Sequence, residues 1–227
     1  MTKASDNTQQ QYYIAEQIAA VRALHHNVLS RAHGAFSISE LLAAQANNVL
    51  AAHGSENPAV VFHLACWCPG LVSKPASEIF SHPLTIDEAK LSMAREYGYE
   101  NWSQVEGVVD VTFESAVDAL MHGELEVLQG MIKADPALAT QTSAYGHRAT
   151  LLHYLGANGV ETQRQVAPYN AGALCELLIS SGADVNASAN IYGGSTALQL
   201  VESSAHPHAA GVVEAVAAVL RGHGAEG

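Results

Sequence analysis

Three segments in the second half of the chain align with one another, and an internal repeat constrains the fold more than any other sequence feature. Each segment has a short motif at its start and a Leu- or Val-containing stretch after it. The aligned motifs are Ala116-Val-Asp-Ala-Leu-Met-His-Gly123 with Glu126-Val-Leu and Met131-Ile; Thr150-Leu-Leu-His153 with Gly159, Leu177-Leu-Ile and Gly182-Ala-Asp-Val-Asn-Ala187; and Thr196-Ala-Leu-Gln199 with Val219-Leu and Gly224-Ala225. Repeated units of this length bury their apolar residues by stacking on their neighbours.

This pattern resembles the ankyrin repeat over about residues 113–225, most closely in the second segment. The first segment lacks the Thr and His of the helix start, and Gln199 stands where the third would carry His. The resemblance implies a short helical solenoid of about three repeats. It also implies a structural role for His153, whose imidazole would bond loop backbone beside the hydroxyl of Thr150. The run from His147 to Glu161 looks like a bacterial ankyrin subfamily, and residues 94–102 are similar to a helix that often precedes bacterial ankyrin repeats.

Two of the three repeats are longer than an ordinary one. About 18 residues separate the two ends of an ankyrin helix pair, and the first repeat keeps this interval, from Val117 to Asp135. The interval is 29 residues from His153 to Gly182 and 25 residues from Gln199 to Gly224. Both insertions fall between the two helices of a repeat, so stacked repeats should place them side by side, and such insertions often mark a binding face.

The insertions and the hairpin between them supply the candidate binding residues. They are His153, Asn158, Glu161, Arg164, Gln165, Asn170, Tyr192 and His206. Each has a simpler interpretation: Asn158 and Glu161 would satisfy turn amides at a helix end, and Arg164 would brace the loop by an ion pair with Glu161. His206-Pro-His208 has no carboxylate pattern beside it, so we expect a loop histidine pair and no metal site.

The first half predicts helices. Apolar residues spaced three and four apart predict one from Gln10 to His33, and capping boxes start others at Ser37, Thr85 and Ser103. The Ser37 helix runs to Gly54, the Thr85 helix is closed by Gly98, and the Ser103 helix runs towards Val109. Residues 59–68 predict a buried helix, and the Pro- and Gly-containing residues 69–83 predict an ordered connector. We therefore expect an all-α chain, with an N-terminal helical region (1–110) capping an ankyrin-repeat domain (111–227).

The charge of the chain excludes several partners. Ten Lys and Arg stand against 22 Asp and Glu, a formal charge of −12, whereas nucleic acids and anionic lipids require a basic surface. Eight acids and no Lys or Arg lie between Glu96 and Glu126, with Glu106, Asp110, Glu114 and Asp118 four apart; we expect a solvated outer face there. Three cysteines, an odd number, and no apolar span of about 20 residues predict a reduced cytoplasmic protein without a membrane segment.

Two functions remain open. The first is a non-catalytic binding protein that holds a protein partner or a small molecule on the stacked insertions, as a monomer or a homodimer and without a cofactor. The second is a small-molecule enzyme of the lyase, isomerase or hydrolase type, with a pocket between the N-terminal helices and the insertions. Glu161 or His206 would be its general base and Arg164 its anion clamp, with His153 nearby. None of the common catalytic signatures occurs in the sequence.

Overall fold

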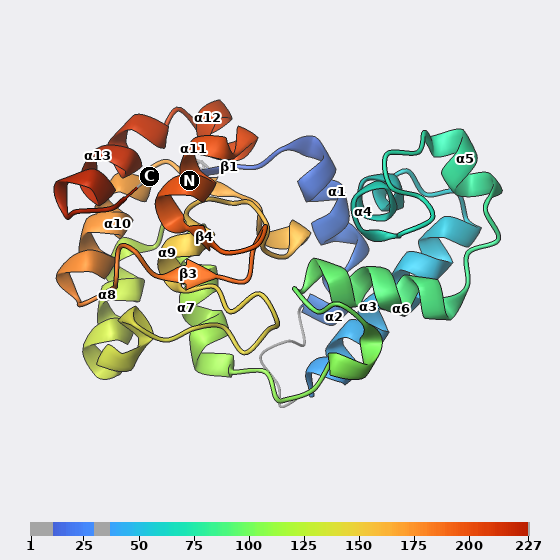
Figure 1. Ribbon diagram of the computed structural model, residues 1–227, viewed down its shortest axis with the longest axis horizontal. Helices are drawn as coiled ribbons and strands as arrows, with labels where there is room; N and C mark the ends of the chain where they lie inside the picture. The colour runs from blue at the N-terminus through green and yellow to red at the C-terminus, as the bar shows by residue number, and fades with distance from the viewer. Residues whose placement is uncertain (1–10, 30–36, 227) are drawn as a thin grey trace, which may run out of the picture.

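The computed structural model describes residues 11–29 and 37–226, and this part of the chain is mostly helical, as expected. Figure 1 shows two groups of helices, and α1 of the first group lies on the side that faces the second. The first group contains α1 (Glu16–Leu24), α2 (His26–Leu29), α3 (Ile38–Gly54), α4 (Ala59–Trp67), α5 (Ala76–Ser81), α6 (Ile86–Glu96) and the 3₁₀ helix η1 (Trp102–Gln104). The second contains α7 (Val111–Met121), α8 (Leu125–Ala134), η2 (Pro136–Ala139), α9 (Leu151–Tyr154), η3 (Thr162–Arg164), α10 (Ala171–Ser180), α11 (Ala197–Ser203), α12 (Ala205–Ala210) and α13 (Val213–Gly222).

Two of the three predicted capping boxes are present. Ser37 caps α3 and Thr85 caps α6, each with the glutamate three residues later bonding back to the cap amide. Gly98 follows α6 with a φ of +83°, as expected for a glycine that ends a helix. The long helix α3 ends at Gly54 and residues 59–67 form α4, so the sequence located these elements correctly.

Two local predictions in the first half are wrong, and a third, the ordered connector, is incomplete. The expected helix over residues 10–33 begins only at Glu16 and is broken at His25, and its last residues lie outside the described part of the chain. The connector contains α5, because Pro75 in extended conformation allows a helix to begin directly after it. The third capping box does not form, since Asn101 caps η1 two residues earlier and the chain leaves helical conformation at Val105.

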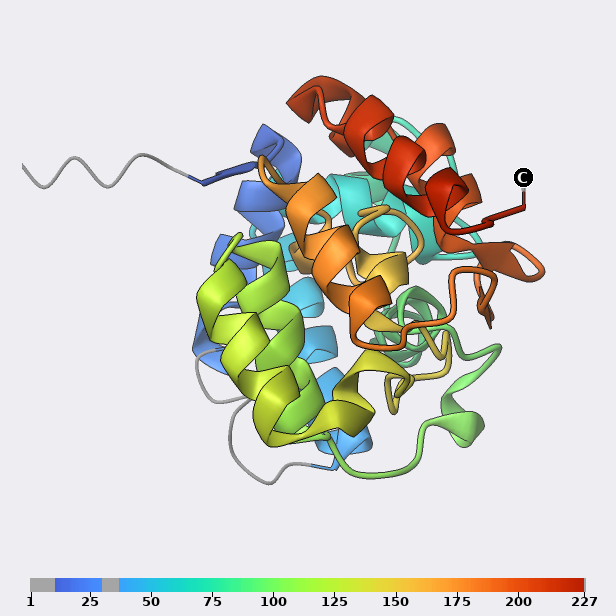
Figure 2. The same cartoon turned by 90° about the vertical axis from the view of Figure 1, so that its left-hand side faces the viewer.

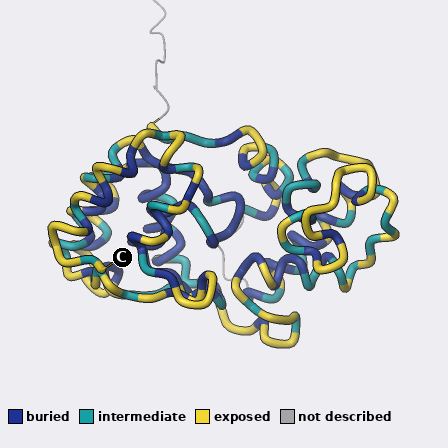
Figure 3. The backbone as a smooth tube through the Cα atoms, turned by 45° about the horizontal axis from the view of Figure 1, so that its top comes forward, coloured by how far each residue is buried: buried dark blue, intermediate teal, exposed yellow. Residues whose placement is uncertain are grey.

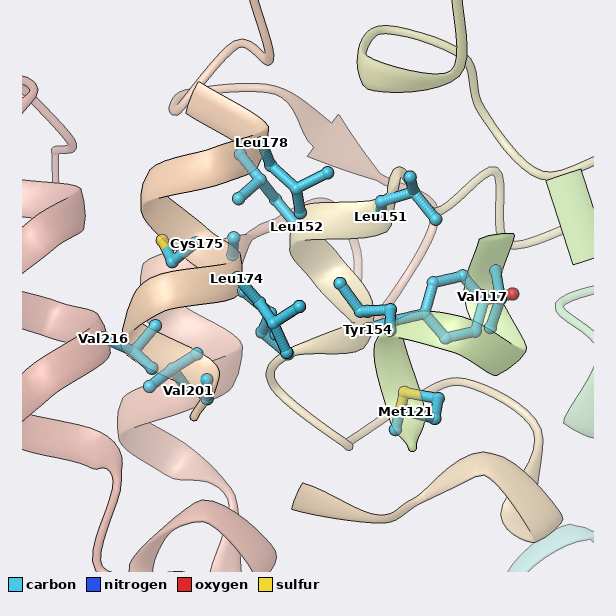
Figure 4. Close-up of a cluster of buried hydrophobic side chains, with 14 of the residues drawn as sticks. Val117, Met121, Leu151, Leu152, Tyr154, Leu174, Cys175, Leu178, Val201 and Val216 are labelled. Atoms are coloured by element: carbon cyan, nitrogen blue, oxygen red, sulfur yellow. The ribbon is translucent and has the colours of Figure 1, made fainter. Parts of the chain in front are cut away.

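The helices of the second group form two rows. Helices α7, α9 and α11 contact one another in order, as do α8, α10 and α13, and α7 also packs against α8 and α10 against α9. Figure 2 shows the second row, α8, α10 and α13, side by side. Residues from both rows share the apolar interior shown in Figure 4, where the ring of Tyr154 extends from α9 towards Val117 of α7.

The two insertions lie against each other, as the stacking argument predicts. The first contains η3 and the strand β2 (Ala167–Pro168), and the second contains α12, which packs on β2. β2 pairs antiparallel with β1 (Tyr12–Tyr13), which α12 also contacts, so the N-terminal strand joins the insertions. A second two-stranded ribbon, β3 (Ser188–Ala189) with β4 (Ser195–Thr196), precedes α11. These four short strands are the only departure from an all-α fold in the described residues.

The apolar residues form two cores, and each core includes a few buried residues from the other part of the chain. One core takes its side chains from α7 to α13 but includes Ala15 and Ile18 from the N-terminal region. The other spans Val28 to Val109 and includes Tyr145 from the second half. Each part of the chain therefore contributes to the core of the other. Figure 3 shows buried residues along the inner sides of both groups and exposed residues along the outer loops.

None of the described helices combines the length and the apolar character that crossing a bilayer requires.

Candidate functional site

A layer of buried polar side chains separates the two cores, and we call it the polar seam. Its members are His25, His63, Ser92, Glu96, Glu114, Asp118, His147, Tyr154, Glu161, Thr162, Gln163 and Arg164. All except two are essentially inaccessible to solvent; the side chain of Arg164 is 14% exposed and that of Asp118 is 35% exposed. The first insertion carries four of these residues into the interior, between α1 and α7.

Arg164 is the cation at the centre of one half of the seam. Its Nη1 donates to Glu114 Oε2 and lies 3.6 Å from Glu161 Oε1, while its Nη2 lies 3.1 Å from Asp118 Oδ1. Glu114 and Asp118 stand four residues apart on α7, so both carboxylates face the same side of the helix. The expected loop-bracing contact between Arg164 and Glu161 is present, but it is one of three carboxylate contacts.

The hydrogen bonds of His147 fix its neutral tautomer. Its Nδ1 accepts a bond from the amide of Ala149, so the ring proton lies on Nε2, which faces Glu161 Oε1 at 3.6 Å. The hydroxyl of Tyr154 donates to the same carboxylate oxygen at 3.3 Å. Burial and the neighbouring carboxylates Glu161 and Glu114 raise the pKa of Tyr154 well above its ordinary value, so the phenol remains a donor.

A chain of short contacts makes up the other half of the seam. The hydroxyl of Ser92 donates to the carbonyl of Ala89 and therefore accepts from His63 Nε2, at 2.8 Å. His63 Nδ1 lies 2.8 Å from Glu96 Oε2, and Glu96 Oε1 accepts the amide of Thr162 at 2.6 Å. This chain ties α4 and α6 of the first group to the insertion of the second. The order serine, histidine, carboxylate is that of a hydrolase triad. Ser92 is nevertheless fully buried, and its hydroxyl proton is donated to the carbonyl of Ala89, so this chain has the contacts of a structural network.

The environment separates the pKa values of the buried carboxyl groups. Burial, opposed by Arg164 and aided by Glu161 and Asp118, raises the pKa of Glu114 to about 7. Burial acts in the same direction on Glu161 and Glu96, but it is outweighed: His147 and Arg164 lower the pKa of Glu161, and His63 and Thr162 lower that of Glu96. Desolvation lowers the pKa of His25 to about 4, so this ring is neutral at physiological pH. Near neutral pH, Glu114 is thus the seam carboxyl group that exchanges a proton.

Several buried polar atoms of the seam have no hydrogen-bond partner among the described residues. They are both ring nitrogens of His25, Glu114 Oε1, His147 Nε2, Glu161 Oε2, Thr162 Oγ1 and Gln163 Oε1. A buried polar group left unsatisfied costs about 1–3 kcal/mol, and native proteins contain few of them. Most of the buried polar atoms without a partner in the described part of the chain lie in this one layer.

The structure brings only part of the predicted site together. Glu161 and Arg164 meet in the seam, and the side-chain amide of Gln165 donates to the carbonyl of Val160 within the same loop. His206 was expected beside Arg164. Its ring instead faces the ring of Tyr13, with 6.5 Å between the two ring centroids. The insertions do touch, but through β2 and α12, and η3 turns inward between α1 and α7 and away from α12.

The remaining predicted residues have structural contacts. His153 accepts from the amide of Thr150 at Nδ1 and donates from Nε2 to the carbonyl of Ser195, as the ankyrin resemblance implies. The hydroxyl of Tyr192 donates to Asn158 Oδ1, and Asn170 donates to the carbonyl of Gly123.

Most members of the seam were not predicted from the sequence. The acidic run was expected to face solvent, yet Glu96 and Glu114 within it are buried. One signal was available: the acidic run from Glu96 to Glu126 contains no Lys or Arg, so its buried acids need a cation from elsewhere in the chain. Arg164 lies in a loop that folding alone does not require to contain it. His25, His63 and Ser92 carried no such signal.

No cluster of His, Cys, Asp and Glu suited to a metal ion occurs in residues 11–29 and 37–226. The chain matches no protein-family model, no curated protein and no solved structure. The geometry of the seam is therefore the basis for assigning a function.

Replacing Glu114 with glutamine should change how stability depends on pH. The folded pKa of about 7 exceeds the ordinary 4.5, so this group stabilises the fold below pH 4.5 and that contribution is lost as the pH rises through about 7. The shift corresponds to about 3 kcal/mol. The stability difference between wild type and Glu114→Gln, measured by urea unfolding, should therefore fall between pH 5 and pH 8. Glu126→Gln, at an exposed position of α8, is the control and should give a constant difference.

Proposed function

We propose that the protein binds a small polar molecule in the polar seam, with the second half of the chain serving as an ankyrin-repeat scaffold. The observation that carries this proposal is the set of buried polar atoms without partners in the seam. The ankyrin interpretation is supported by the two rows of helices and by the contacts of Thr150 and His153. In this arrangement the expanded second repeat uses its insertion to build the interior of the site.

A small ligand is favoured over a macromolecular partner by the burial of the first insertion. Its residues Glu161, Thr162 and Gln163 are between 0% and 5% exposed, so a protein surface cannot reach them. The partly exposed side chains of Asp118 and Arg164 mark the side from which a small molecule would enter. This proposal keeps the expected binding role and moves it from the outer surface of the insertions to the interior.

A small-molecule enzyme is the second candidate, favoured by one observation. Glu114 has a pKa of about 7, which is the value that suits a general acid or base at neutral pH. Arg164 is within reach to stabilise an anion, and Tyr154 is a neutral donor. His206 has no part in this version of the site, because its ring lies on Tyr13.

The test is to identify what the purified protein carries. Wild-type protein is isolated under native conditions, denatured, and its small-molecule fraction analysed by mass spectrometry; we expect one compound at a stoichiometry near the protein concentration. Thr162→Val is nearly isosteric and removes a hydroxyl without a described partner, so it should lower the amount of compound and preserve the fold. Thr112→Val, at an exposed position of α7, should carry the wild-type amount.

The outcomes separate the two candidates. Recovery of a single unchanged compound supports the binding protein, whereas a mixture in which one compound converts to another during incubation supports the enzyme. Wild-type protein that carries no compound, with Thr162→Val as stable as wild type or more stable, would show that the seam holds only water and would overturn both.

A further inference from the structure

We infer that the ligand of the polar seam is a small cation that donates hydrogen bonds, such as a protonated amine or a guanidinium group. This inference rests on the proposed binding function and specifies its ligand class. It follows from the kinds of atoms that lack partners and from the balance of charge around them.

The atoms without partners are mainly acceptors. Glu114 Oε1, Glu161 Oε2 and Gln163 Oε1 can only accept a hydrogen bond when the acids are ionised. Thr162 Oγ1 and the neutral ring of His25 can each donate or accept, and His147 Nε2 is a donor that lies 3.6 Å from Glu161 Oε1. A molecule rich in N–H donors would satisfy this set, whereas a carboxylate or phosphate would leave the acceptors unsatisfied.

The charge of the seam also favours a cation. Glu96, Glu114 and Glu161 are buried acids, and Asp118 adds a fourth at the partly exposed side. Among the described residues of the seam, Arg164 is the permanent cation placed against them, and the ring of His63 contacts Glu96. His147 is held as a neutral donor by the amide of Ala149. An additional cation would compensate the surplus of negative charge, and an anion would increase it.

The carboxylates of Glu114 and Glu161 define where the charged group of the ligand would bind. One oxygen of each carboxylate faces Nη1 of Arg164, so the free oxygens belong to two acids bridged by a single nitrogen. Thr162, next to Glu161 in the chain, adds a hydroxyl. An ammonium group can donate three bonds, which matches two carboxylate oxygens and one hydroxyl.

Cation binding should be coupled to the release of a proton. The groups that face Glu114 are Arg164 and Glu161 from the insertion, Asp118 on its own helix, and the phenols of Tyr145 and Tyr154. Since the pKa of Glu114 is about 7, this group is partly protonated at neutral pH, and a bound cation favours its ionised form. The apparent affinity for an amine should therefore increase by roughly tenfold per pH unit below pH 7 and level off above it.

Three molecules of similar size but different charge test the ligand class: propylamine, 1-propanol and propionate. Each is added at tens of millimolar to the full-length protein at constant ionic strength, and binding is followed by the thermal midpoint and by titration calorimetry at pH 6 and pH 8. We expect stabilisation by propylamine alone, stronger at pH 8. Glu114→Gln and Thr162→Val should each weaken it by about tenfold, and Glu126→Gln should leave it unchanged.

The possible results distinguish this inference from the proposed function. Stabilisation by propionate or propanol in place of propylamine would overturn the ligand class and leave the binding function standing. If none of the three binds, the compound recovered from the purified protein decides: a compound with an amino or guanidino group supports the inference, and one without overturns it. Absence of both probe binding and a recovered compound would overturn the inference together with the proposed function.

Discussion

Arg164→Met is expected to lower the free energy of unfolding by about 3–5 kcal/mol, the usual cost of removing one partner from a buried ion pair. Methionine fills a similar volume but leaves the carboxylates of Glu114 and Glu161 buried without their cation. Urea unfolding at pH 8, where Glu114 is largely ionised, measures the loss. At pH 5 the loss should be smaller, because Glu114 is then protonated in the folded state.

Two further variants make this prediction specific. Glu114→Gln introduced into Arg164→Met should restore part of the stability, since it removes one of the uncompensated charges. Arg221→Met breaks the exposed pair with Glu202, where the arginine side chain is 56% exposed, and should cost less than about 1 kcal/mol. A loss at Arg164 no larger than at Arg221 would contradict the description of the seam as a buried electrostatic network.

Gly98→Ala is expected to lower the free energy of unfolding by more than about 4 kcal/mol. Losses of this size are exceptional, and steric conflict with rigid surroundings is one of their causes. A Cβ at residue 98 would lie 2.2 Å from the amide nitrogen of His147 and 2.6 Å from its Cα. Both are backbone atoms, and that same amide bonds the carbonyl of Tyr97, so neither side can move alone. The end of α6 would have to separate from the loop at residues 146–147, which holds the two parts of the chain together.

Gly211→Ala is the matched control for this substitution. Gly211 ends α12 with a φ of +72°, close to the +83° of Gly98, but a Cβ there would meet no atom within 4 Å. Only the conformational cost of about 1–2 kcal/mol should remain. Thermal and urea unfolding of the two variants separates the cost of the left-handed conformation from that of close contact, and equal losses would show that the two halves do not meet as described.

Sequence patterns located most elements because the forces that start and end helices are local. The boxes at Ser37 and Thr85 each satisfy backbone amides with side chains three residues away, and both form. The box at Ser103 failed because Asn101 offered a competing cap in the same stretch of chain. The lengths of the insertions were also visible in the sequence, and the stacking argument predicted that the two would lie side by side, as β2 and α12 do.

The sequence by itself determined a mostly helical chain with long connections inside two helix pairs, since periodicity, caps and interval lengths are properties of neighbouring residues. Only the tertiary structure decided that the first insertion turns inward and that Arg164 meets Glu114 and Asp118 across about 50 residues of chain. The physical reason is that a buried charge is stabilised by whatever opposite charge the packing brings near it, and no local pattern records that partner. The same holds for Glu96, which faces His63 from one side and the amide of Thr162 from the other.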